Sequence, residues 1–93
     1  MGWLSDEQVK QMGFRSIGEN ILIDESATFY RCSSIRLGSS IRIDAQAELV
    51  AGPGDLVIGD HVHVSRGCVI HGQAGVIFED FVRVYSLCIT VDQ

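Results

Sequence analysis

The stretch that decides the fold covers residues 58–70 and reads IGDHVHVSRGCVI. It places aliphatic residues at Ile58, Val64 and Ile70, six positions apart each time, and a glycine directly after the first. Two other stretches repeat this pattern: IGENILIDESATF over residues 17–29 and LGSSIRIDAQAEL over residues 37–49. A large apolar residue every six positions, within a larger period of about twenty residues, is typical of a solenoid whose coils each contain three short strands.

Aligning residues one coil apart tests the repeat, because such residues should stack at the spacing of adjacent strands, about 4.8 Å. The predicted inward columns are Ile17/Leu37/Ile58/Phe78, Ile23/Ile43/Val64/Val84, Phe29/Leu49/Ile70/Thr90 and the small-residue column Ala27/Ala47/Cys68/Cys88. The extra residues of each period fall at one corner, around residues 33–36, 52–57 and 72–77. The sequence therefore predicts an all-β fold of about four triangular coils over residues 16–91, within a single domain covering residues 1–93.

Residues 1–15 differ from the repeat and predict a short helix. Ser5 and Gln8 have the spacing of a capping box, and Gly13 is a natural helix stop. We expect the helix to cover the first coil with the apolar residues Trp3, Leu4, Val9, Met12 and Phe14.

Composition excludes several classes of function. The chain has 93 residues and a net charge of −5, which disfavours binding to nucleic acid or to an anionic membrane. No apolar run reaches the length of a membrane span, and the first residues, MGWLSDEQ, lack the pattern of a signal peptide. Three cysteines without metal-ligand spacing predict no metal site and a reducing, cytoplasmic location.

The repeat resembles that of the hexapeptide-repeat acyltransferases. Their motif is an aliphatic residue, a glycine or acidic residue, two free positions, a small residue and a free position; residues 58–63 (IGDHVH) and 43–48 (IDAQAE) fit it. The resemblance implies a left-handed parallel β-helix. The helix followed by FRSIGENILIDESATFY, residues 14–30, resembles the N-terminal part of sugar and amino-sugar O- or N-acetyltransferases.

This resemblance implies acyl transfer from a coenzyme A thioester, such as acetyl-CoA, to a hydroxyl or amine of a sugar-like acceptor. It also implies a homotrimer with a histidine base at the cleft between subunits. In the family, further coils follow the region that resembles VRVYSLCI (residues 82–89), and the catalytic histidine generally lies after it. The chain is thus expected to lack that histidine and much of the coenzyme A site. The alternative is a non-catalytic oligomeric β-helix module used for assembly or binding.

The histidines and arginines supply the candidate site residues. His71 is the candidate base, expected at a turn position beside the inserted corner, with no orienting partner recognisable in the sequence. Arg42, His63 and Arg83 share an outward column, and such stacked cations need anions. Either carboxylates of a neighbouring chain or a ligand phosphate would serve. A structural role for each histidine remains the alternative, and His61 is expected to be a solvated turn residue.

Two outward columns become apolar toward the C-terminus, which is typical of an interface. They are Ser16/Arg36/Val57/Ile77 and Thr28/Glu48/Val69/Ile89. We expect a homotrimer that uses Val57, Val69, Ile77 and Ile89. Because SLCITVDQ has no capping signature, two trimers are further expected to meet through their C-terminal ends as a hexamer.

Overall fold

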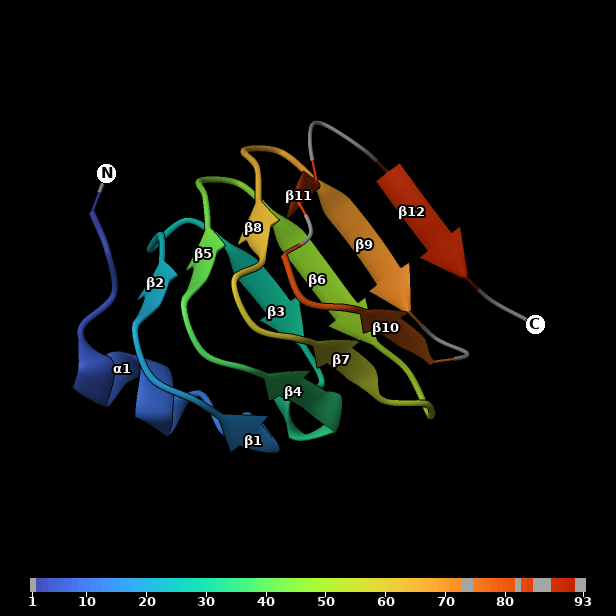
Figure 1. The fold of residues 1–93 in the computed structure, drawn as a ribbon, viewed down its shortest axis with the longest axis horizontal. Helices are drawn as coiled ribbons and strands as arrows, with labels where there is room; N and C mark the ends of the chain where they lie inside the picture. The colour runs from blue at the N-terminus through green and yellow to red at the C-terminus, as the bar shows by residue number, and fades with distance from the viewer. Residues whose placement is uncertain (1, 73–74, 82, 85–87, 92–93) are drawn as a thin grey trace.

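Three parallel sheets form the walls of the computed structural model, which describes residues 2–72, 75–81, 83–84 and 88–91 (Figure 1). In these residues, each sheet takes one strand from each of four successive coils. The first sheet contains β1 (Ser16–Ile17), β4 (Ile35–Leu37), β7 (Leu56–Ile58) and β10 (Val76–Phe78). The second contains β2 (Ile21–Ile23), β5 (Ile41–Ile43), β8 (His63–Val64) and β11 (Arg83–Val84). The third contains β3 (Thr28–Tyr30), β6 (Glu48–Ala51), β9 (Val69–Gly72) and β12 (Cys88–Val91).

The strand register confirms the predicted solenoid. Ile23, Ile43, Val64 and Val84 are successive partners along the second sheet, and the column that begins at Ile17 is equally in register along the first. The chain winds as a left-handed parallel β-helix, as the family resemblance implied (Figure 1). Its interior is filled by isoleucine, leucine and valine, and the small residues Ala47 and Cys68 are also buried.

The register of the fourth coil corrects one prediction. Ile70 is paired with Ile89, and His71 with Thr90, so Thr90 does not continue the inward column of Ile70. The same shift pairs Cys88 with Val69 rather than with Cys68. Ile89 follows Val84 by five positions, whereas Ile70 follows Val64 by six. A strict count of six therefore misses the observed pairing of β12 with β9 by one residue.

The N-terminal helix α1 (Asp6–Gln11) begins at the predicted capping box. The Ser5 backbone N–H donates to Gln8 Oε1 over 2.8 Å, and the Gln8 backbone N–H donates to Ser5 Oγ over 3.2 Å. Val9 is buried against the coils, while Leu4 and Phe14 pack on the core. The helix thus covers the first coil as expected.

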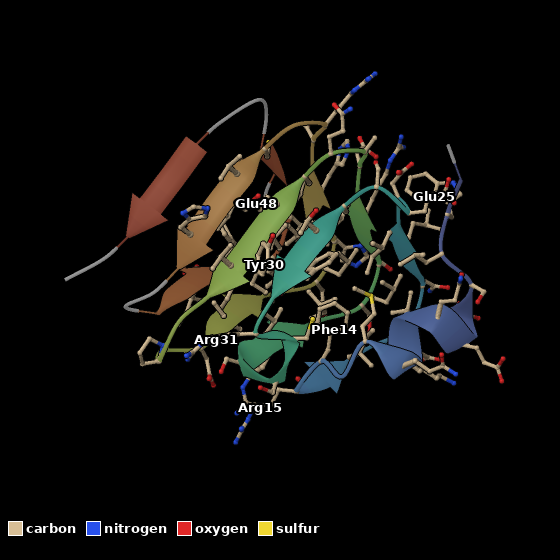
Figure 2. All side chains as sticks on the ribbon, turned by 180° about the vertical axis from the view of Figure 1, so that it is seen from behind. Phe14, Arg15, Glu25, Tyr30, Arg31 and Glu48 are labelled. Atoms are coloured by element: carbon tan, nitrogen blue, oxygen red, sulfur yellow. The ribbon has the colours of Figure 1, made fainter. Side chains whose placement is uncertain are left out.

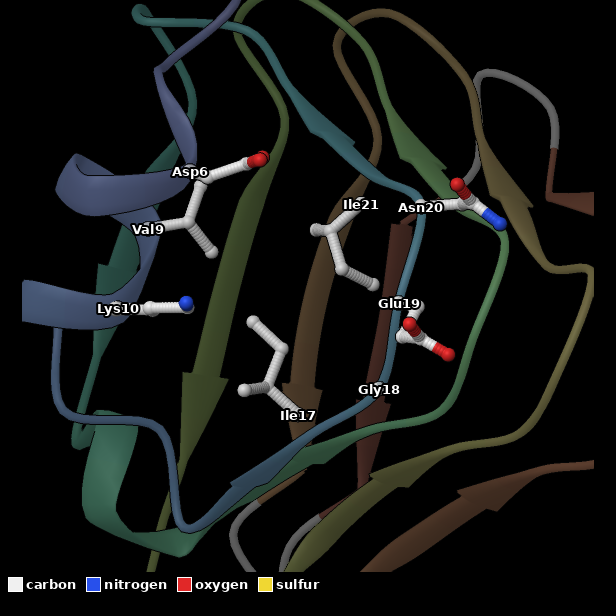
Figure 3. A pocket seen from close by; sticks show the side chains of 8 residues that line it. All are labelled: Asp6, Val9, Lys10, Ile17, Gly18, Glu19, Asn20 and Ile21. Carbon is white, nitrogen blue, oxygen red and sulfur yellow. The ribbon is translucent and has the colours of Figure 1, made fainter.

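Trp3 departs from the expected cover. Its side chain is 45% exposed, and its backbone forms an isolated antiparallel bridge with Asp24. The Arg42 guanidinium lies 5.5 Å from the centre of the Trp3 ring. Between α1 and the first coil an open pocket of about 280 Å³ remains, in which Val9, Ile17 and Ile21 point toward one another (Figure 3). The N-terminal segment therefore covers the first coil only in part, because Trp3 lies beside Arg42.

One corner of every coil carries a ladder of polar side chains. Ser39 Oγ accepts the backbone N–H of Glu19, and Asp60 Oδ1 accepts that of Ser39 over 2.8 Å. Asp80 Oδ1 accepts the backbone N–H of Asp60, also over 2.8 Å. Each side chain thus satisfies a backbone donor of the preceding coil, which holds adjacent coils in register. The first inserted corner contains the short 3₁₀ helix η1 (Cys32–Ser34).

Candidate functional site

A histidine–carboxylate pair lies on the outward face of the sheet of β3, β6, β9 and β12. His71 Nε2 is 2.8 Å from Glu48 Oε2, and both side chains are about one-third exposed. Figure 2 shows this face and labels Tyr30 and Glu48 on it. A carboxylate at this distance fixes the orientation of the imidazole. The remaining ring nitrogen faces no partner among the described residues, so the pair is suited to accept a proton.

This geometry corrects two expectations for His71. The residue is on strand β9 rather than at a turn, since the corner begins only after Gly72. Its orienting partner exists, and it comes from the preceding coil. Glu48 is in register with Val69, and His71 lies two residues further along the same face. The pair could therefore have been found in the sequence by looking for a histidine one coil plus two residues after a carboxylate.

A second cluster lies on the sheet of β2, β5, β8 and β11. Asp44 Oδ1 accepts the Arg42 Nε–H over 2.8 Å, and Asp44 Oδ2 is 2.8 Å from His63 Nε2. Arg42 and His63 are in register with each other and with Arg83, as predicted. The anion that they need is Asp44 of the same chain, one residue beyond β5. Neither a neighbouring chain nor a ligand is required to balance them, and the Arg83 side chain lies outside the described residues.

The surroundings of Asp44 stabilise its ionised form. Partial burial opposes ionisation, but the hydrogen bonds from His63 and Arg42 outweigh it and hold the pKa of the Asp44 carboxyl below its ordinary value. Asp24, at the equivalent position of the preceding coil, has a lowered pKa because it accepts hydrogen bonds from the Ser26 hydroxyl and backbone N–H. Both carboxylates thus support folding in the ionised state.

We expect acid to remove this support. A carboxyl whose pKa is lower in the folded state stabilises the fold above its unfolded pKa, about 4, and loses that contribution as pH falls through the folded value. Asp44→Asn should therefore melt at a lower temperature than the parent at pH 7 and show a smaller drop in melting temperature between pH 5 and pH 2. Thermal melting followed by circular dichroism measures both. Glu7→Gln, on the exposed face of α1, is the control, and an unchanged pH profile in Asp44→Asn would contradict the assignment.

His61 is exposed at a corner, as expected, but it is not simply solvated. Its ring is parallel to that of Phe81, with 3° between the planes and 4.7 Å between the centroids. Together with Arg42 and His63, these rings line an open pocket of about 340 Å³. The two residues belong to successive coils, 20 positions apart in the sequence.

The predicted interface residues occupy outward positions where they are described. Val57 and Val69 are half-buried, and Ile77 is 70% exposed. Ile89 is paired with Ile70, and its side chain lies outside the described residues. In the described part of the chain, no helix is both long and apolar enough to cross a membrane.

The chain is similar to proteins that acylate sugars. No protein-family model matches it. It is 37% identical over 86 residues to the dTDP-4-amino-4,6-dideoxy-D-glucose acyltransferase of Escherichia coli. The matched region covers 92% of this chain and 45% of the relative. The chain thus spans about half the length of the curated relative that it matches.

Solved structures give the same result. A variant of AntD, an N-acyltransferase from Bacillus cereus in complex with dTDP and coenzyme A, superposes with a TM-score of 0.84 and 28% identity, covering 94% of this chain and 44% of AntD. AntD in complex with dTDP and 3-hydroxybutyryl-CoA gives a TM-score of 0.80 and 32% identity, covering 89% of this chain and 44% of AntD. The hexapeptide repeat, the solenoid and both comparisons agree, and the chain is built like part of a sugar acyltransferase of the hexapeptide-repeat family, a little under half of its length.

Proposed function

We propose that this chain takes part in transferring an acyl group from an acyl-CoA to the amino group of a nucleotide-linked amino sugar. The observation that carries the proposal is the similarity over 92% of the chain to an acyltransferase named for such an acceptor. The complexes of AntD with coenzyme A and 3-hydroxybutyryl-CoA support a coenzyme A thioester as donor. Acetyl-CoA, which the sequence suggested, is one member of that class of donors.

His71 is the proposed base. In the reaction, the acceptor nitrogen attacks the thioester carbonyl, a C–N bond forms, the C–S bond breaks, and coenzyme A leaves as a thiolate that becomes the thiol by taking the proton that His71 has received from the nitrogen. The nitrogen loses one proton, which the free ring nitrogen of His71 accepts. Glu48, 2.8 Å from the other ring nitrogen, stabilises the imidazolium that results. Because the pair is exposed on the face of a sheet, a second protein surface has to cover it to exclude water from the reaction.

A second copy of the chain is proposed to supply this covering surface. The His71 face carries Val69 and Val50, both half-buried, and Tyr30, which is 52% exposed. A face of apolar side chains around a paired histidine and carboxylate suits a contact between subunits. The proposed assembly is a homotrimer with parallel coil axes, which uses Val57, Val69 and Ile77.

Val69→Lys is expected to dissociate this trimer. The substitution places a charge at the centre of the proposed contact, beside Glu48, which His71 already engages. Sedimentation equilibrium at tens of micromolar should show trimers for the parent and monomers for the variant. The matched control is Lys10→Ala on α1, which should stay trimeric. A monomeric parent would reject the trimer, and a trimeric Val69→Lys would show that the interface lies on another face.

Calorimetric titration with acetyl-CoA and 3-hydroxybutyryl-CoA tests the proposed function. Binding with a dissociation constant of roughly micromolar to millimolar, within the common range for enzyme substrates, is expected for at least one donor. No heat with either donor at millimolar concentration would favour the alternative, a non-catalytic module for assembly. The two outcomes exclude each other, because an assembly module has no reason to bind a thioester of coenzyme A.

A further inference from the structure

Two columns of outward side chains flank the inserted corner, where the chain passes from the third sheet to the first. The tyrosine column lies on the third sheet, just before the corner, and its successive ladder partners are Tyr30, Val50 and His71. The arginine column lies on the first sheet, just after the corner, and its successive partners are Arg36, Val57 and Ile77. One corner thus separates the face that carries the proposed base from a face that is partly aliphatic.

The two columns reach nearly equal heights along the axis of the coil. One coil of about twenty residues rises by one strand spacing, about 4.8 Å, so six residues rise by roughly 1.5 Å. Separations of six, seven and six positions hold for the pairs Tyr30/Arg36, Val50/Val57 and His71/Ile77. Copies related by rotation about an axis parallel to the coils meet at equal heights. The tyrosine column of one copy would therefore face the arginine column of the next, pair by pair.

The paired side chains are chemically complementary. Tyr30 offers a ring that is 52% exposed, opposite the cationic guanidinium of Arg36. The valines of the middle pair are both half-buried. Ile77 is an exposed aliphatic residue opposite the base that needs a cover. A column that met its own copy would instead place two arginines against each other, which is repulsive.

The ion pair of Arg36 is compatible with this contact. Its Nε–H donates to Asp55 Oδ2 over 3.1 Å, and the N–H groups of a guanidinium lie in its plane. Stacking on an aromatic ring uses the flat face of the guanidinium, which an in-plane hydrogen bond leaves open. Arg36 can thus keep Asp55 while it stacks on a tyrosine of another copy.

We propose that a second copy of this chain docks its arginine column on the tyrosine column, so that Ile77 of the second copy covers the His71–Glu48 pair. Resting on the proposed function for the role of His71, this docking adds which face of the second copy covers the base and which residue of that copy enters the site. Because the two columns differ, each copy in a closed ring both supplies one cover and receives one.

Disulfide cross-linking tests the docking without any substrate. Val50→Cys and Val57→Cys chains, co-expressed and then oxidised, should form covalent dimers on a non-reducing gel, because the two positions face each other across the contact. Separate chains are used so that no bond can form between the two introduced cysteines within one copy. Each variant oxidised alone should give no more dimer than the parent, which contains the native cysteines, since neither column faces itself.

An off-register pair is the matched control for cross-linking. Thr28→Cys and Ile77→Cys lie on the same two sheets but more than two coils apart, roughly 10 Å along the axis. This distance exceeds the reach of a disulfide, so co-expressed chains of these variants should stay at the monomer mass.

Arg36→Lys and Tyr30→Leu test the stacked pair at the same contact. Each should weaken association about fivefold in sedimentation equilibrium, and the double variant should be no weaker than the single ones, because both remove one interaction. Lysine keeps the charge and loses the plane. Arg66→Lys, at an exposed position on another corner, should associate like the parent.

Three results would overturn the docking. They are no dimer from the mixed Val50→Cys and Val57→Cys chains, equal dimer from either variant alone, and equal dimer from the off-register pair. Release of coenzyme A thiol judges the proposed acyl transfer separately. Cross-linked copies without thiol release would keep the docking and reject the function, and thiol release without cross-linking would do the reverse.

Discussion

Ile43→Asp is expected to abolish the cooperative folding of this chain. Ile43 is 0% exposed and lies in register between Ile23 and Val64, which are equally buried. An ionised carboxylate there would have apolar neighbours in the coils on both sides and no hydrogen-bond donor. The cost of burying such a group, together with the lost apolar contacts, is about 5 kcal/mol or more, comparable with the whole stability of a small domain. Thermal melting followed by circular dichroism should show no transition.

Leu22→Asp is the matched control for this experiment. Leu22 lies on β2, one residue before Ile23, and its side chain points outward and is 44% exposed. The same substitution should change the stability there by no more than about 0.5 kcal/mol. Cooperative melting of Ile43→Asp near the parent temperature would show that Ile43 is not inside the coil and would reject the predicted inward column.

Gly38→Ala is expected to destabilise the fold by about 3 kcal/mol, at the upper end for an overpacked site. A Cβ at Gly38 would collide with Asp60 Oδ1 and lie 2.7 Å from the Gly59 carbonyl oxygen. Asp60 cannot move away without releasing the backbone N–H of Ser39. The Gly59 backbone cannot move without separating two coils. Urea denaturation measures the loss as a lower midpoint at an unchanged slope.

The double variant Gly38→Ala/Asp60→Ala shows which contact matters. It should remain destabilised, because the contact with the Gly59 backbone persists after the carboxylate is removed. Gly2→Ala is the control, since a Cβ at Gly2 meets nothing closer than 4.0 Å. Parent-like denaturation of Gly38→Ala would mean that the coils are not stacked as closely at this corner as the structure has them.

The repeat made most of the fold predictable. Aliphatics at a spacing of six residues identify the inward positions, and the capping box at Ser5 identifies the helix. The prediction was wrong at Thr90, because Ile70 is paired with Ile89 instead. Trp3 was also misplaced, because hydrophobicity alone does not distinguish packing on the core from packing against an arginine.

The site was less predictable than the fold, because its side chains pair across coils. Glu48 and His71 are 23 residues apart, and Asp44 and His63 are 19 apart. Neither spacing equals the length of one coil. Aligning residues one coil apart therefore identifies each of these residues as outward-facing but does not predict which of them are in contact.

The central claim is that this chain takes part in acyl transfer with His71 as the base. The most direct measurement is the release of coenzyme A thiol from 3-hydroxybutyryl-CoA or acetyl-CoA, with dTDP-4-amino-4,6-dideoxyglucose as acceptor. The account predicts thiol release that depends on the acceptor, and a kcat that falls about 100-fold or more in His71→Asn while the melting temperature is kept. Thiol release that is absent with the acceptor, or equal in His71→Asn and the parent, would contradict it.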